Sequence, residues 1–467
     1  MPISLAQEII YGSVEGVAQL LQLGVDVNEV DEYGFTPLIE TAIANKVEIA
    51  ELLLQHGANI KGIDMTGRTA LHWAVDNYNM PLCELLLKNH ANANAYSASG
   101  QPILTYPLLR NQIDLKSLLY SHGADLDFTQ DYINTKLIGH RYELAGEVYI
   151  VDTDGRFILI DLEGFFFEFT LSILENSLKR YLKNYAARNQ QDSFSKLQVM
   201  IKALEVAAEL IKYQQYTINI YDHSKHINDL LDNDMIVIPV AYEGHAITFI
   251  QYGDYVVKCD RGANSKIEGT VVIYRINKPR SLTKNFIKDL IYQKHDREFV
   301  NRGINKHLGL MRVGNIPLSA QISGNCSWAN VEASIPAMMY LLLLSEHEFA
   351  NADDINAMKT KSMHFYEEWH EWDKDRAIEE CINSFAYANS ARKATKASLL
   401  GAVMFQSCNY QNQKDIVRAE KILPVLSNNK FEYILRTYLK HYCIEAKTER
   451  GANLKHLLDI VAPRHFD

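Results

Sequence analysis

A pattern of glycine and leucine residues recurs every 33 residues through the first 130 positions of the chain. Complete copies begin at Asp31, Asp64 and Ser97. The recurring residues are Gly34, Gly67 and Gly100, then Leu38, Leu71 and Leu104, and the leucine triplets at 52–54 and 85–87. An incomplete first copy ends at Leu20, Leu21 and Gly24. This period predicts a stack of short units, because each unit can bury its apolar face only against its neighbours.

The pattern within each copy resembles the ankyrin repeat. The family's T-P-L element corresponds to Thr36–Leu38, and its L-L-L-x-x-G-A element corresponds to Leu52–Ala58. The resemblance implies an all-α solenoid of four repeats, at about 1–30, 31–63, 64–96 and 97–129. It also implies helix pairs joined by exposed tips, with a surface that binds another protein.

The repeat register singles out side chains that stacking does not require. Glu40, Trp73 and Tyr106 occupy equivalent positions on the first helix of three successive repeats, where we expect them to face outward. The tips add Glu32, Tyr33, Phe35, Met65 and Arg68. Aromatic side chains dominate protein-binding surfaces, so these residues are the candidate partner-binding face. The alternative is that Trp73 packs against the next repeat or the following domain.

The repeat region is strongly acidic. Residues 1–130 contain 6 Lys and Arg against 15 Asp and Glu, a net charge of −9, whereas the whole chain has −10. This charge argues against direct binding of nucleic acid by the repeats and favours a protein partner with a basic surface.

Cysteine spacing and hydropathy indicate the kind of compartment in which the chain folds. The closest of the six cysteines are 27 residues apart, and His223 and His226 form an H-x-x-H pair without a supporting cluster of Cys or carboxylate residues. We therefore expect free thiols in a reducing compartment, with no metal and no cofactor. The first residues lack a basic signal region, and the longest apolar run, 335–344, is about half of a membrane span. The sequence predicts neither secretion signal nor membrane segment.

The middle of the chain, 130–345, is predicted to be an α+β domain. Two strands surround the turn at Thr153–Gly155, and helical patterns follow at about 167–185 and 194–213. Apolar strands separated by short polar turns then begin at Asp234. Alternating strands and turns of this kind predict an antiparallel sheet covered by helices.

Three residues of this domain suggest nucleophilic chemistry. His245 begins a strand, Asp260 ends the next strand, and Cys326 begins an apolar helix. If the two strands pair about a tight turn at 252–253, His245 and Asp260 face each other. An acid can hold one imidazole nitrogen and leave the other as a base, while a helix start stabilises a thiolate. The alternative is that each residue serves packing alone.

The segments IPVAYEGHAITF, YVVKCDRG and QISGNCSW are similar to those of the adenain and ubiquitin-like-protease group of cysteine peptidases. That group also includes effector deubiquitinases and related effector acetyltransferases. The resemblance implies a site of His245, Asp260 and Cys326, with Gln321 as an oxyanion-hole residue. This chain departs from the group at Ala246, where the family has Trp, and at Asn325 and Ser327, which flank the cysteine.

The last region, 346–467, is predicted to be an all-α C-terminal cap. Helical patterns cover about 353–385, 391–404, 414–424, 431–444 and 454–461. The aromatic, acidic segment that contains Trp369 and Trp372 indicates a helix that docks these two side chains.

The combination of domains resembles the ankyrin-repeat effectors that intracellular bacteria such as Legionella inject into host cells. The resemblance implies passage from the bacterial cytoplasm through a type IV secretion system to the host cytosol or nucleus, where the repeats would bind a host protein. The sequence leaves three functions open. These are a cysteine protease or ubiquitin-like-conjugate hydrolase, an acyltransferase with the same triad, and a non-enzymatic adaptor with a vestigial triad.

Overall fold

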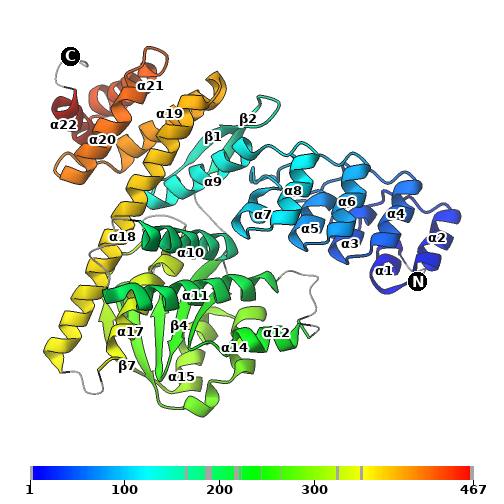
Figure 1. Ribbon diagram of the computed structural model, residues 1–467, viewed down its shortest axis with the longest axis horizontal. Coiled ribbons are helices and arrows are strands. Elements are labelled where there is room, and N and C mark those ends of the chain that lie inside the picture. Colours follow the sequence, from blue (N-terminus) through cyan, green and yellow to red (C-terminus); the bar gives the residue numbers. More distant parts are fainter. Residues whose placement is uncertain are drawn as a thin grey trace. The chain divides into compact units, whose positions relative to one another are not determined.

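The computed structural model describes residues 4–162, 167–184, 192–214, 220–221, 223–242, 244–262, 265–321, 325–347 and 351–462 (Figure 1). The chain forms two compact units, and neither is a continuous stretch of sequence. The first contains Met1–Lys136, Glu147–Asp161 and Tyr387–Leu399. The second contains Leu137–Gly146, Leu162–Ala386 and Leu400–Asp467.

The first unit contains the repeats, whose helices form two parallel rows (Figure 1). The successive pairs are α1 (Leu5–Tyr11) with α2 (Val14–Gln22), α3 (Pro37–Ile43) with α4 (Val47–Gln55), α5 (Ala70–Asp76) with α6 (Met80–Lys88), and α7 (Thr105–Leu109) with α8 (Ile113–Ser121). The predicted all-α stack is confirmed, and the degenerate first copy forms a complete pair.

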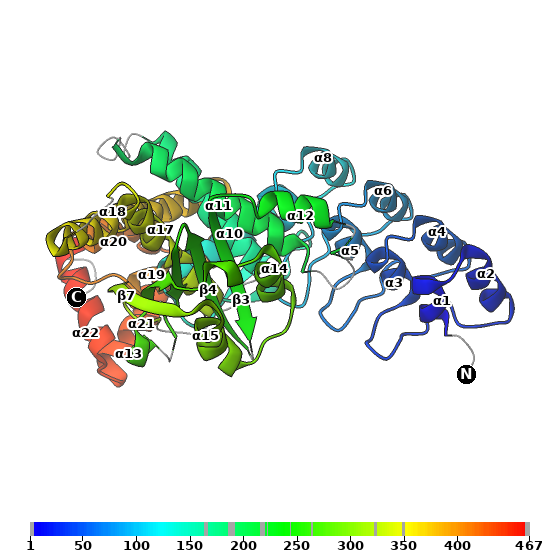
Figure 2. The same ribbon diagram turned by 90° about the horizontal axis from the view of Figure 1, so that it is seen from below.

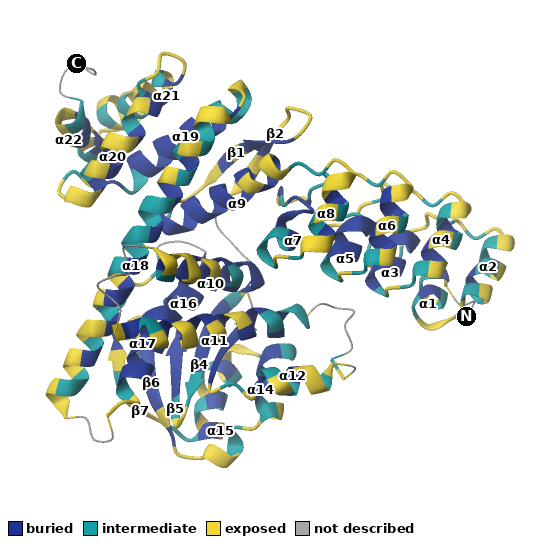
Figure 3. Ribbon diagram, viewed as in Figure 1, coloured by how far each residue is buried: buried dark blue, intermediate teal, exposed yellow. Residues whose placement is uncertain are grey.

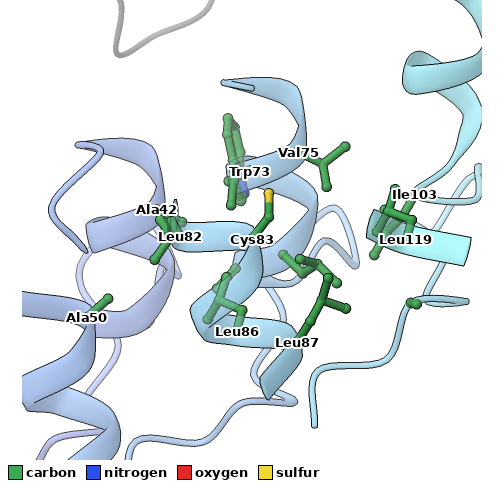
Figure 4. Close-up of a cluster of buried hydrophobic side chains, with 14 of the residues drawn as sticks. Ala42, Ala50, Trp73, Val75, Leu82, Cys83, Leu86, Leu87, Ile103 and Leu119 are labelled. Atoms are coloured by element: carbon green, nitrogen blue, oxygen red, sulfur yellow. The ribbon is translucent and has the colours of Figure 1, made fainter. Parts of the chain in front are cut away.

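Local sequence explains where the repeat helices begin and what they bury. The Thr36 side chain accepts a hydrogen bond from the Ile39 backbone N–H, and Pro37 follows at the first helical position. Between neighbouring repeats, Leu82, Cys83 and Leu86 are fully buried and form the continuous core drawn in Figure 4. The recurring leucines are therefore core residues, as the repeat period predicts.

The predicted hairpin at 147–161 belongs to the first unit. Strands β1 (Glu147–Val151) and β2 (Phe157–Asp161) pair antiparallel around the expected turn. A Cβ atom at Gly100 would lie 2.3 Å from Ile160 Cδ1, so the hairpin packs closely on the tip of the last repeat. The helix α9 (Leu126–Arg141) begins in this unit, where the Lys136 ammonium donates to the Asp161 carbonyl over 2.7 Å.

The second unit is built on a five-stranded antiparallel sheet in sequential order. Its strands are β3 (Met235–Tyr242), β4 (His245–Tyr252), β5 (Tyr255–Cys259), β6 (Val271–Ile276) and β7 (Leu310–Ile316). The helices α11 (Phe194–Lys212) and α17 (Ser334–Leu344) cover one face, and α14 (Lys284–Tyr292) and α15 (Ile304–Leu308) cover the other (Figures 1 and 2). Figure 3 shows the central strands buried between these layers. The predicted helix-covered antiparallel sheet is confirmed.

The pairing register of β4 and β5 corrects the expectation from sequence. Tyr252 pairs with Tyr255, so the turn consists of Gly253 and Asp254, with Gly253 at φ 54°. The predicted turn at 252–253 is wrong by one position. In the observed register Asp260 lies diagonally from His245 on the same face of the ladder, rather than directly opposite. Both turns have two residues, but a tight hairpin turn needs a positive φ at its first residue, and Gly253 adopts it more easily than Tyr252 would.

The predicted C-terminal helices are confirmed. They are α18 (Ala352–Tyr387), α19 (Ser390–Gln406), α20 (Gln413–Leu426), α21 (Glu432–Tyr438) and α22 (Glu449–Val461). Trp369 of α18 is fully buried, and its indole N–H donates to Ser177 Oγ of α10 (Phe167–Lys183) over 3.0 Å. The ring of Trp372 contacts Tyr181 of the same helix at 5.2 Å between centroids. The aromatic segment is therefore a docking helix.

Across the described ranges, no helix combines the length and apolar character that a membrane crossing requires.

Candidate active site

The sheet brings His245 and Asp260 together at its end. His245 is the first residue of β4, after Gly244 at φ 76°, and Asp260 directly follows β5. Their side chains share one face of the ladder, and His245 Nε2 lies 3.1 Å from Asp260 Oδ1. The contact fixes one ring nitrogen and leaves Nδ1 as the nitrogen that can serve a third group.

Asp260 is buried but remains the charged partner. Its Oδ1 also accepts from the Gly262 backbone N–H over 3.1 Å, and the buried Lys258 ammonium lies 4.0 Å from Oδ2. Burial disfavours the carboxylate, but the hydrogen bond and charge of His245, together with Lys258, outweigh burial and lower the pKa of Asp260. A charged carboxylate at this position stabilises a protonated imidazole.

Gly262 makes room for the imidazole ring. A Cβ atom at this position would lie 2.6 Å from His245 Cε1 and 3.2 Å from Asp260 Oδ1. Any larger residue would displace the ring from the carboxylate. Sequence reasoning did not single out Gly262, although its place two residues after the acid was the available signal.

Cys326 completes the cluster. It is the first residue of α16 (Cys326–Glu332) and is half-buried. Burial of the sulfur disfavours the thiolate, but hydrogen bonds from His245 and from the Ala246 backbone outweigh burial and lower the pKa of the thiol. Hydrogen bonds to Asp260 and then to Cys326 raise the pKa of His245 to about 9. Both shifts act in the same direction, since each favours the pair of thiolate and imidazolium over the neutral pair.

Four of the other five cysteines differ from Cys326 in the direction of their pKa shift. Burial raises the pKa of the Cys83 thiol to about 12, and burial also raises the pKa of Cys259, Cys408 and Cys443. Cys259 is fully buried on the opposite face of β5 from Asp260, as its alternation in the strand predicts. In contrast to these four, Cys326 has surroundings that lower the pKa of its thiol.

Gln321 is held beside the same strand. Its backbone N–H donates to the Arg261 carbonyl over 2.9 Å, one residue after Asp260. The side chain is partly buried, and its Oε1 has no hydrogen-bond partner among the described residues. Residues 322–324, which join Gln321 to the cysteine helix, lie outside the described residues. The backbone contact places Gln321 near the end of β5.

A buried ionic cluster holds the far end of α16. Glu332 forms ion pairs with Arg141 and Arg261, the second over 3.7 Å between Arg261 Nη1 and Oε2. Arg141 also pairs with Asp373 of α18, and its side chain is fully buried. This cluster joins residues far apart in the sequence, so repeat and strand patterns offered no signal for it.

Comparisons with known proteins bear on the repeats and on the chain as a whole. The family model of ankyrin repeats (three copies) matches residues 5–97 and 61–130. None of the curated proteins matches the chain. The solved structure of the Legionella effector AnkH is 44% identical in sequence, and the match covers 98% of this chain and 97% of that one with a TM-score of 0.89. The chain belongs to the AnkH family. The similarity to AnkH therefore extends through the sheet and the C-terminal helices as well as the repeats.

The repeat surface of this AnkH-family chain differs from the expectation for Trp73 and Glu40. Trp73 is 8% exposed and Glu40 is 4% exposed, so neither faces outward. The Trp73 indole donates to Asp64 Oδ2 over 3.0 Å, and its ring meets Phe35 of the preceding repeat edge-on at 6.0 Å. Trp73 is therefore buried, as the alternative held, but its ring contacts the preceding repeat rather than the next one, because a large flat ring buries more apolar area between repeats than on a free face.

The remaining candidate residues divide by exposure. Tyr33 and Met65 are 62% and 84% exposed, and Glu32 is also exposed. Phe35, Arg68 and Tyr106 are half-buried. The Arg68 guanidinium lies 4.1 Å from the centroid of the Trp73 ring. The Arg110 guanidinium lies 4.7 Å from the centroid of the Tyr106 ring. The free surface therefore lies at the tips, and not on the line through Glu40, Trp73 and Tyr106.

Glu40 is a protonated core residue. Burial and a hydrogen bond with the Asp31 carboxyl raise the pKa of Glu40 from 4.5 to about 8. Asp31 is engaged as an acceptor, because its Oδ1 receives the backbone N–H groups of Tyr33 and Phe35 over 3.0 and 2.7 Å. Two carboxyl groups can share a hydrogen bond only while one keeps its proton. Glu40 therefore contributes little charge to the acidic surface at neutral pH.

Replacing Glu40 with Gln is expected to stabilise the repeats at high pH. Between pH 4.5 and about 8 the folded chain holds a proton that the unfolded chain has lost. The native protein therefore loses stability as pH rises through this window, and the loss is complete above it. Glutamine donates to Asp31 at every pH. Thermal unfolding should show a larger gain for Glu40→Gln at pH 8 than at pH 5, and equal gains would contradict a protonated Glu40.

Proposed function

We propose that this chain is a translocated effector that binds a host protein through its ankyrin repeats and cleaves acyl bonds with a Cys326 thiolate. The observation that carries the proposal is the contact of His245 with both Asp260 and the Cys326 thiol, which lowers the pKa of the thiol. Membership of the AnkH family supports the effector role. The resemblance of three segments to ubiquitin-like proteases supports the thiol chemistry.

The proposed reaction is hydrolysis of a peptide or isopeptide bond. The Cys326 thiolate attacks the carbonyl carbon, and the C–N bond breaks as His245 gives its proton to the leaving amine. Water then attacks the thioester and gives a proton to His245, the C–S bond breaks, and the acid product leaves the Cys326 thiolate beside the imidazolium. Asp260 stabilises the imidazolium throughout, and the backbone N–H of Cys326 with the Gln321 amide would stabilise the oxyanion.

The repeats supply the partner in this proposal. Their exposed tips present aromatic, apolar and acidic side chains, of which Tyr33, Met65 and Glu32 are the most accessible of the candidates. The acidic character of residues 1–130 suits a host protein with a basic surface. Binding there would raise the local concentration of substrate at the thiol.

The pH dependence of alkylation tests the proposed chemistry. For the wild-type chain, the rate of Cys326 alkylation by iodoacetamide at pH 6 should exceed that of an ordinary thiol, because the lowered pKa leaves more of the sulfur as thiolate. For His245→Ala the thiol loses this partner, and the rate should rise about tenfold per pH unit toward an ordinary thiol pKa. Mass spectrometry of the Cys326 peptide measures both rates.

The outcomes separate the functions that the sequence left open. An acid-shifted wild-type profile with release of a ubiquitin-like conjugate supports the hydrolase. If the acyl group is transferred to an amine or hydroxyl instead of water, the chain is an acyltransferase rather than a hydrolase. If the pH dependence of Cys326 alkylation is the same in the wild type and in His245→Ala, the histidine does not activate the thiol, and the non-enzymatic adaptor is the function that remains.

A further inference from the structure

One buried amide lies at the centre of the candidate site. Asn330 is fully buried on α16, one helical turn after Cys326 and on the same side of that helix. Its Oδ1 accepts the Arg261 backbone N–H over 2.6 Å, and its Nδ2 donates to the Ala246 backbone carbonyl over 2.6 Å. A single side chain therefore bonds the main chains that follow β5 and begin β4.

The position of these bonds is unusual for a sheet. The ladder of β4 and β5 ends at the pair of Thr248 and Cys259. In this register Ala246 and Arg261 would form the next pair on that face, and their main chains would bond directly. Instead, each backbone group bonds to the Asn330 amide, which stands between the two strands. The amide therefore separates the strand ends while satisfying both backbone groups.

Each contact of Asn330 lies beside a residue of the proposed triad. Ala246 follows His245, Arg261 follows Asp260, and Asn330 shares its helix with Cys326. The Ala246 backbone also forms a hydrogen bond with the Cys326 thiol. The Arg261 carbonyl accepts from the backbone of Gln321 over 2.9 Å. One amide thus connects the segments that carry the nucleophile, base, acid and oxyanion candidate.

We infer that Asn330 is a positioning residue that sets the distance between the Cys326 thiol and the His245–Asp260 pair. The inference rests on the proposed thiol chemistry. The hydrogen bonds of the Asn330 side chain go to the backbone of Ala246 and Arg261, so its effect on the thiol and the imidazole passes through these two backbone segments. Without the amide, the strand ends can close on each other, and the helix loses its two bonds to them.

The test compares Cys326 alkylation profiles from pH 5.5 to 9 for the full-length wild type, Asn330→Leu and Asn330→Ala. Leucine has a similar volume but no hydrogen-bonding group, and alanine is the second variant in case leucine prevents folding. At pH 6 we expect each variant that folds to react about tenfold to a hundredfold more slowly than the wild type. The rate should recover above pH 8.5 as the thiol ionises without imidazolium.

A stability control distinguishes positioning from general loosening. Leu341 of α17 is 1% exposed and lies outside the cluster, so Leu341→Ala destabilises the same unit without touching the strand ends. This variant should lose melting temperature and keep the wild-type pH profile. If an Asn330 variant keeps the pH profile of Cys326 alkylation seen in the wild type, the positioning role is overturned. The same holds if Leu341→Ala shifts the profile as much as the Asn330 variants do. If Cys326 of the wild type itself has the pH profile of an ordinary thiol, both the proposed chemistry and the positioning role are overturned.

Discussion

Replacing Cys326 with alanine is expected to abolish hydrolysis and covalent labelling while leaving the fold intact. The side chain is half-buried at the first position of α16, so its truncation removes one sulfur atom and little packing. Because the thiolate forms the new bond in the proposed reaction, its loss removes the reaction path, and activity should fall by about three orders of magnitude or more. The change in melting temperature should be as small as the change that substitutions of exposed or half-buried residues usually cause.

The matched control for this experiment is Cys443→Ala. Cys443 is also half-buried, but burial raises the pKa of its thiol. We expect this variant to keep wild-type labelling at pH 6, as measured by intact-mass spectrometry. Residual labelling of Cys326→Ala at the wild-type rate would mean that another thiol reacts, and the assignment of the nucleophile would fail.

Replacing Trp73 with alanine is expected to destabilise the repeats by about 3–5 kcal/mol of unfolding free energy. The ring is 8% exposed, its indole bonds to Asp64 of the same repeat, and its contact with Phe35 joins it to the preceding repeat. Truncation leaves a cavity and a buried Asp64 oxygen without its donor. Because repeats depend on their neighbours, the loss should lower the stability of the whole stack. Urea unfolding followed by circular dichroism measures the change.

Met65→Ala provides the contrast for Trp73. Met65 is 84% exposed at a repeat tip, so its truncation should change the unfolding free energy by about 0.5 kcal/mol or less. If the tips bind the partner, Met65→Ala should weaken partner binding without unfolding the chain. A Trp73→Ala variant as stable as Met65→Ala would mean that the indole contributes no packing between repeats.

Several elements follow from local sequence. The 33-residue period determines the helix pairs, because any chain with that spacing of leucine and glycine can bury its apolar faces only by stacking. Alternation places Cys259 and Asp260 on opposite faces of β5, and a glycine at 253 confines the turn to one of a few positions. Local patterns also sufficed for the helices of the C-terminal region.

Other features depend on contacts that sequence spacing does not encode. The pairing register of β4 and β5 shifts with the choice of turn residues, and two adjacent turns are compatible with the same apolar pattern. The exposure of Trp73 depends on the neighbouring repeat, since the same register position carries Glu40, Trp73 or Tyr106. An aromatic side chain suits a binding face and a core equally well, so residue type alone does not separate them.

The sequence by itself determined the ankyrin stack, the antiparallel sheet and the order of His245, Asp260 and Cys326, because periodicity and short motifs act over one helix or one hairpin. Only the tertiary structure decided that Asn330 joins Ala246 to Arg261 and that Arg141 pairs with Glu332. These partners are 84, 69 and 191 residues apart. Bonds between such distant groups arise from the way in which the layers pack, and a polar side chain gives no local signal of the partner that packing will bring to it.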